Sequence, residues 1–264
     1  MKEAYQLPAY YFLGYGWKNS AQEEQVKLGR KREREAQIEN PKVRYPRQGR
    51  EVTLLDVSRP TAIGQYTIFA GHRLFLKGLE QGNAPALIFA GEPPLHDHGE
   101  TSADVNEHQF NLINRNYPDP TIIKARGLAN TTSTELDRAF EAAVENDIDH
   151  FGVVAYGPHV LRTRLTAWRK RLERKLRVKP DVSVTVVDAK KVLSDPQMYT
   201  DSQRITSEEK AQRHSRYHRK LVKTKGHLKL LANEIVTTPV ELLIGHKLTD
   251  RLAARGLRLK VMSS

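Results

Sequence analysis

The sequence predicts an α/β protein, a Rossmann-like three-layer sandwich around a mostly parallel sheet with a C-terminal helical extension. Short apolar segments alternate with amphipathic segments of helical length, as βαβ units require. The short segments are continuously apolar, which is typical of strands covered on both faces. Glycine and polar residues follow several of these segments, where parallel sheets collect their ligands.

The first strand is expected over Ala9–Leu13, a compact apolar run that ends in glycines. Ser20–Asn40 is dense in charged residues, and its first residues resemble a capping box, so we expect an exposed helix. Residues 41–66 are rich in proline and glycine and predict a loop-rich excursion with one short strand near Val52–Val57.

From residue 66 the pattern becomes regular. A helix is expected over Tyr66–Gln81, with Gly82 as its stop signal. Further strands are expected over Ala86–Ala90, Thr121–Ala125, Phe151–Ala155 and Val182–Val187. Further helices are expected over Ser102–Asn114, Ser133–Glu145 and Val160–Leu176.

The pattern divides the chain into a sheet domain over residues 1–194, with a charged insertion at about 18–65, and a basic helical extension over residues 195–264. Helices in the extension are expected over Ser207–Lys225, Leu228–Val236 and Pro239–Arg255. The extension either packs on the sheet domain or is partly mobile, and the sequence leaves both alternatives open.

Composition restricts the chemistry. The chain has no cysteine, which excludes disulfides, thiolate metal sites and cysteine nucleophiles. Its formal net charge of +12 favours acidic metabolites or weak, nonspecific nucleic-acid binding, although a solvated basic face explains it equally well. The sequence predicts no membrane span and no signal peptide, so we expect a cytoplasmic protein. It does not indicate an oligomeric state.

Two strand ends carry glycines. Gly14 and Gly16 follow the first strand, and Gly91 and Glu92 follow the strand at Ala86–Ala90. Glycine allows backbone N–H groups to approach a phosphate closely, although a plain tight turn explains the pattern as well. His96-x-His98 lies just beyond; a solvated polar loop is a simpler explanation than a metal site, so we predict no bound metal.

A run of amide and hydroxyl residues opens the helix after the third strand. The run is Asn130, Thr131, Thr132 and Ser133. The first turn of a helix attracts anions because its N–H groups lack partners and the helix dipole is positive there. An ordinary N-cap explains one hydroxyl residue fully but explains the whole run less well.

His159 follows the strand at Phe151–Ala155, and Arg162 lies one helical turn later. This pair can contact a phosphate or carboxylate, and histidine exchanges a proton near neutral pH. A lone histidine here is more often a cap, but the His-x-x-Arg spacing favours a ligand contact.

These strand ends, in this order, resemble the YdcF/SanA/ElyC-like family, a bacterial domain of largely unknown function. The matching segments are Leu13-Gly14, His72-Arg73-Leu74, Phe89-Ala90-Gly91, Asn130-Thr131-Thr132, and Val153-Val154 through His159 and Arg162. Glu92 stands where the family has a second glycine. Asp104 corresponds to the family's acidic helix opener by its spacing, with Glu100 as the other candidate. The resemblance to the YdcF-like type without a membrane anchor implies a nucleotide-type ligand such as S-adenosylmethionine.

The leading hypothesis is a protein that binds a small phosphorylated or nucleotide-like anion, with or without an enzymatic reaction. Arg73 and Arg162 would neutralise the ligand, and His159 would act as acid or base, with Asp104 orienting a partner. Backbone groups of Gly14, Gly91 and residues 131–133 would contact the ligand closely.

Two alternatives use the basic segments. A polyanion such as nucleic acid could bind Arg162–Lys179 and Arg204–Lys229 through its phosphates. An adaptor protein could use the C-terminal helices to bind another protein.

Overall fold

A computed structural model describes residues 6–13, 17–18, 59–90, 101–125, 129, 131–175, 182–199, 207–223, 231–232 and 235. Its centre is a five-stranded, all-parallel sheet in the order β5-β4-β1-β6-β7, which confirms the predicted α/β class. The strands are β1 (Ala9–Phe12), β4 (Ala86–Phe89), β5 (Ile122–Lys124), β6 (His150–Ala155) and β7 (Ser183–Asp188). A separate two-stranded antiparallel pair joins β2 (Trp17–Lys18) to β3 (Arg59–Pro60).

The strand order contains a reversal beside β1. The chain runs from β1 to β4 and β5 on one side, and then returns to place β6 and β7 on the other side. Tyr10 of β1 is therefore opposite Leu87 of β4 and Gly152 of β6. In open parallel sheets, ligands bind beyond the carboxyl ends of the strands at such a reversal.

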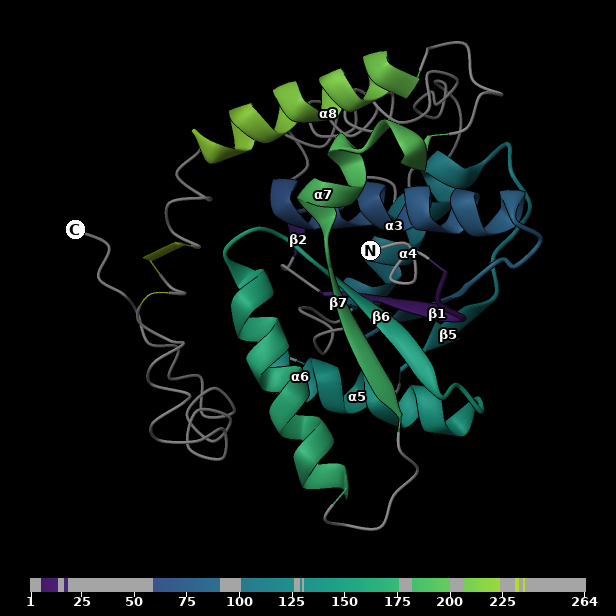
Figure 1. The fold of residues 1–264 in the computed structure, drawn as a ribbon, viewed down its shortest axis with the longest axis vertical. Coiled ribbons are helices and arrows are strands. Elements are labelled where there is room, and N and C mark those ends of the chain that lie inside the picture. The colour runs from purple at the N-terminus through teal and green to yellow at the C-terminus, as the bar shows by residue number, and fades with distance from the viewer. Residues whose placement is uncertain are drawn as a thin grey trace.

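Helices cover both faces of the sheet (Figure 1). They are α3 (Ala62–Glu80), α4 (Ser102–Asn114), α5 (Thr132–Glu145), α6 (His159–Lys175), α7 (Ala189–Ser194) and α8 (Ser207–Val222), with a 3₁₀ helix, η2 (Pro196–Met198), between the last two. In Figure 1, α3, α4 and α7 lie on one face, α5 and α6 lie on the other, and α8 lies outside α3 and α7. The arrangement is the predicted three-layer sandwich.

The side chains of β1 alternate between two cores. Tyr10 and Phe12 belong to the core beneath α3 and α4, whereas Ala9, Tyr11 and Leu13 belong to the core beneath α5 and α6. This alternation is expected for a strand covered on both faces.

The core beneath α3 and α4 requires a glycine in α3. A Cβ atom at Gly71 would lie 1.7 Å from Cε1 of Phe12, so a larger residue would displace that ring. The same ring lies 5.0 Å from the ring of Phe89 and 6.2 Å from that of Phe110, between centroids. The glycine therefore allows α3 to pack closely on an aromatic cluster.

Most predicted elements occur within a few residues of their expected bounds, and α4 matches them at both ends. The start of α3 was misplaced: it begins at Ala62, where Thr61 caps it by accepting a hydrogen bond from the N–H of Gly64. Pro60 and Gly64 are typical of a loop. Proline is nevertheless allowed directly before an N-cap residue, and the cap formed by Thr61 starts the helix here. Gly82 ends α3 as predicted, with φ of 71°.

The sequence patterns did not predict the short elements. These are α7, η2 and the pair β2–β3, none of which is long enough to show a hydrophobic period. The expected elements at 20–40, 52–57 and 239–255 lie outside the described residues. Among the helices that the structure describes, none is long and apolar enough to cross a membrane.

The structure places α8 against the sheet domain, which decides one alternative that the sequence left open. The fully buried ring of His214 lies 5.5 Å from the ring of Phe69, 6.0 Å from that of Tyr199 and 6.3 Å from that of Tyr66, between centroids. Leu221 is also buried. This part of the basic extension is therefore packed on α3 and η2.

Candidate anion-binding site

Two helices on the same face of the sheet begin beside each other. His159 begins α6, directly after β6, and Thr132 begins α5. The Oγ1 atom of Thr132 lies 3.0 Å from Nε2 of His159, and each residue is only 6% exposed. Sequence reasoning had proposed both residues independently, and the structure brings them into a direct hydrogen bond.

Reciprocal hydrogen bonds cap the start of α5. The Thr131 hydroxyl accepts from the N–H of Thr134, and the Thr134 hydroxyl accepts from the N–H of Thr131. This arrangement is a capping box with threonine in place of the usual acidic residue. An ordinary cap therefore explains Thr131 and Thr134, but leaves Thr132 and Ser133 with separate roles.

Ser133 carries a buried hydroxyl without a partner. The residue is 2% exposed, and its Oγ makes no hydrogen bond. Leaving a buried hydroxyl unsatisfied costs about 1–3 kcal/mol, and such groups are uncommon in folded proteins. A group that can donate one hydrogen bond is thus held in the first turn of α5, next to the Thr132–His159 pair.

The electrostatics of this region favour a negative ligand. The N-termini of α5 and α6 each carry a partial positive charge from the helix dipole, although the first N–H groups of α6, on His159 and Val160, already donate to the carbonyls of Tyr156 and Gly157. Arg162 adds a full positive charge one turn into α6, where it is half-buried. The arrangement suits an oxyanion such as a phosphate or carboxylate.

Asp104 lies in a different network, at the start of α4. Its carboxylate accepts hydrogen bonds from the N–H and the hydroxyl of Thr101, and it pairs with the Lys124 ammonium at 3.1 Å. Burial alone would raise the pKa of Asp104, but these hydrogen bonds and the lysine charge lower it below its ordinary value. The structure therefore gives Asp104 a capping role on α4 and no contact with His159.

Arg73 is also separate from the Thr132–His159 pair. It lies in the second half of α3, on the opposite face of the sheet, and its side chain is fully buried. One guanidinium nitrogen lies 3.2 Å from Nδ1 of His72, and the guanidinium carbon lies 5.2 Å from the centre of the Tyr199 ring. The structure does not bring Arg73 together with Arg162.

The structure reveals a polar aromatic cluster that the sequence analysis missed. Tyr156 follows β6, and its ring lies 5.5 Å from that of Tyr66 and 5.7 Å from that of His218. Burial, reinforced by the Asp188 carboxylate, raises the pKa of Tyr156 to about 12. Burial likewise raises the pKa of Tyr66. A tyrosine directly after a strand was the available signal, but its partners come from α3 and α8.

Several predicted residues cannot be placed. Gly14, Gly16, Gly91, Glu92 and Asn130 lie outside the described residues, as do His96 and His98. Within the described ranges, no group of three or more histidine, aspartate or glutamate side chains is arranged to hold a metal ion.

Comparisons with known proteins found no relative. No protein-family model matches the chain, and neither the curated proteins nor the solved structures include a significant match. The resemblance to the YdcF/SanA/ElyC-like family therefore stays a prediction.

Proposed function

We propose that the protein binds a small anionic ligand, phosphorylated or nucleotide-like, at the starts of α5 and α6. The observation that carries the proposal is the buried Thr132–His159 hydrogen bond with the unpartnered hydroxyl of Ser133 beside it. A ligand oxygen that accepted a hydrogen bond from Ser133 would satisfy this hydroxyl and offset the cost of burying it.

The position in the sheet supports the same site. His159 follows β6, and β6 neighbours β1 at the reversal of strand order. This is the location at which open α/β sheets bind nucleotides and related anions.

The side chains suggest distinct roles. The N-terminal turns of α5 and α6 and the Ser133 hydroxyl would bind the anion, while Arg162 would neutralise its charge. The Thr132 hydroxyl holds the imidazole of His159, which is suited to transfer a proton if the ligand is also a substrate. We leave Asp104 and Arg73 outside this site because their contacts are elsewhere.

Thermal unfolding with added ligands tests the proposal. The panel consists of inorganic phosphate, nucleotides, sugar phosphates and S-adenosylmethionine, the last included because of the family resemblance. A bound ligand at about one hundred times its Kd should stabilise the fold by about 2.7 kcal/mol. We expect at least one stabilising anion, with the effect strongly reduced in Ser133→Ala and Arg162→Ala.

Ser183→Ala is the matched control, because Ser183 begins β7 at the opposite edge of the sheet. The control should keep the full response to the ligand. An anion that stabilises all of these variants equally would place the binding site elsewhere and contradict the proposal, as would the lack of any response across the panel.

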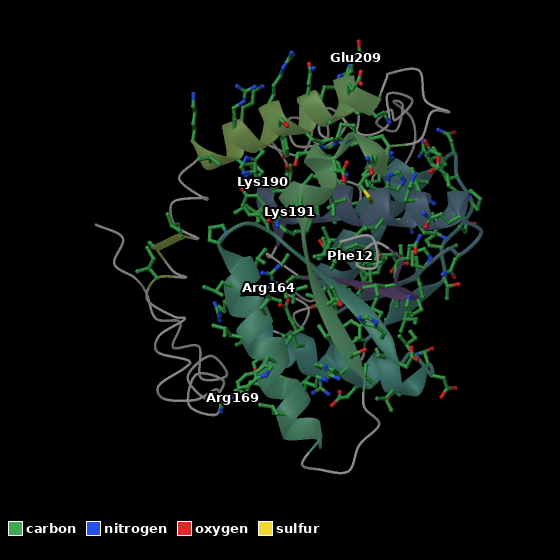
Figure 2. All side chains as sticks on the ribbon, in the orientation of Figure 1. Phe12, Arg164, Arg169, Lys190, Lys191 and Glu209 are labelled. Carbon is green, nitrogen blue, oxygen red and sulfur yellow. The ribbon has the colours of Figure 1, made fainter. Side chains whose placement is uncertain are left out.

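A second candidate function rests on the outer face of α8. Its inner residues pack on the protein, whereas its exposed residues include Arg213, Arg216, Arg219 and Lys220, and the exposed Lys223 follows directly after the helix. Nitrogen-tipped side chains extend outward along α8 (Figure 2). We propose nonspecific polyanion binding here, tested by titrating RNA at several salt concentrations. Binding should weaken steeply with salt, and salt-independent binding would contradict this role.

A further inference from the structure

The outward face of α6 exposes large apolar side chains that the described part of the chain leaves uncovered. Leu161 is 62% exposed, Trp168 is 65% exposed and Leu172 is 42% exposed. The opposite face of the helix is buried through Val160, Thr163, Thr166 and Ala167, and through Lys170, which pairs with Asp137 of α5. Scattered exposed leucines need no explanation, but three large side chains on one helix face indicate a contact surface.

The spacing of these side chains is that of a coiled-coil seam. With half-buried Leu165 included, the positions are 161, 165, 168 and 172, which alternate steps of four and three residues. This is the a/d pattern of a heptad repeat, and it forms a narrower stripe than the apolar face of a helix that covers a core. We call these four residues the α6 ridge.

Arginines flank the α6 ridge on both sides. Arg162 and Arg169 occupy the e positions of the same heptad, and Arg164 and Arg171 occupy the g positions. Side chains of Arg164 and Arg169 extend from α6 in Figure 2. In coiled coils, e and g residues select the partner by charge, so an all-cationic pair of flanks specifies a partner with acidic flanks.

We propose that the α6 ridge docks an acidic amphipathic helix of a partner protein. The partner helix presents an apolar a/d stripe to the ridge, and glutamates or aspartates at its e and g positions to the four arginines. Trp168 is the central anchor, since it is the largest exposed side chain of the ridge and lies near its middle. This surface is distinct from the site at the helix starts except for Arg162, which lies beside both.

Charge argues against other occupants. In a second copy of the chain, α6 would place arginines opposite arginines. The segment 224–264 of the chain itself carries more lysines and arginines than acidic residues. An anionic membrane would suit the charge, but helices that lie in a membrane surface bury a broader apolar face than one a/d stripe.

Titration of labelled synthetic helices with the full chain tests the proposal by fluorescence anisotropy. The probe is a peptide of about three heptads with leucine at a and d and glutamate at e and g. Its matched control has lysine at e and g. We expect the glutamate peptide to bind and the lysine peptide to bind at least about tenfold more weakly. Trp168→Ala should lower the affinity for the glutamate peptide at least about tenfold.

Two variants sharpen the test. The double variant Arg164→Glu/Arg171→Glu should lose its affinity for the glutamate peptide and gain affinity for the lysine peptide. Val222→Ala removes an exposed apolar side chain from α8 and should leave binding unchanged. Melting temperatures of Trp168→Ala and Val222→Ala should stay at the wild-type value, because both side chains are exposed.

Three results would overturn the proposal. The first is failure of the glutamate peptide to bind. The second is binding that Trp168→Ala does not weaken. The third is binding to phosphatidylserine vesicles that depends on Trp168 while neither peptide binds, which would assign the α6 ridge to a membrane surface instead.

Discussion

The two faces of the sheet are built from different side chains. Aromatic rings fill the core beneath α3 and α4, where Phe12, Phe89 and Phe110 contact one another. The core beneath α5 and α6 contains more alanine and valine, with Phe140 and Phe151 as one aromatic pair. The polar groups at the sheet edge differ as well. At the start of α4 the Asp104 carboxylate is fully engaged, whereas at the start of α5 the Ser133 hydroxyl has no partner.

This difference suggests that the α3–α4 side mainly stabilises the fold, whereas the start of α5 is suited to bind a ligand. The α3–α4 side holds the fold together through its large rings and through the Asp104 carboxylate, although its core also contains the unpartnered amide of Gln65. The α5–α6 side keeps the Ser133 hydroxyl without a protein partner at the positive end of a helix, and this hydroxyl contributes when a ligand or an ordered water accepts a hydrogen bond from it. Four substitutions measure this difference, and the chemical denaturation curve of each gives the free energy of unfolding.

The largest effect is expected for Phe110→Ala. The fully buried ring contacts Phe12, Phe75 and Phe89, and its loss should lower the free energy of unfolding by about 3–5 kcal/mol. The exposed neighbour Asn111 provides the control, and Asn111→Ala should change this free energy by less than about 0.5 kcal/mol. Equal effects of the two substitutions would mean that the rings do not anchor this side.

Thr132→Val preserves shape but removes the hydroxyl that contacts His159. The imidazole nitrogen then loses this hydrogen bond inside the protein, at an expected cost of about 1–3 kcal/mol in the free energy of unfolding. Thr121→Val, at an exposed position, should have little effect. A cost no larger than that of the control would show that the Thr132–His159 hydrogen bond does not contribute to stability.

Asp104→Asn should cost about 1 kcal/mol at neutral pH, because it weakens the cap of α4 and removes the pair with Lys124. The folded pKa of Asp104 lies below its unfolded value, so its contribution is present above the unfolded pKa and is lost as pH falls through the folded pKa. The difference between the two proteins should therefore shrink below about pH 4. Glu80→Gln, in an exposed pair with Lys77, should show neither effect, and a difference that persisted in acid would contradict this role.

The smallest effect on stability is expected for Ser133→Ala. Removing an unsatisfied buried hydroxyl should leave the free energy of unfolding unchanged or raise it by up to about 1 kcal/mol. Binding of the anion found in the thermal screen should nevertheless fall. A marked loss of stability would show that the hydroxyl already has a structural role, and would remove the main support for the proposed site.

Local patterns predicted much of the fold but less of the site. The hydrophobic period of residues 102–114 and a stop signal such as Gly82 depend only on neighbouring residues, so these features could be derived without tertiary information. The hydroxyl run at residues 131–133 and the His-x-x-Arg spacing indicated the two helix starts that the structure brings together through the Thr132–His159 hydrogen bond. The roles expected for Asp104 and Arg73 came from the family resemblance, and their contacts lie elsewhere.

The sequence by itself determined the element types, the α/β class and the chemical character of the helix starts, since each follows from side chains close together in the chain. Only the tertiary structure decided which of them meet. The strand order puts the start of α6 beside that of α5 and so joins His159 to Thr132, while Arg73 lies on the opposite face. Such contacts depend on the pairing of strands distant in sequence and on which face each helix covers, and no local period contains that information.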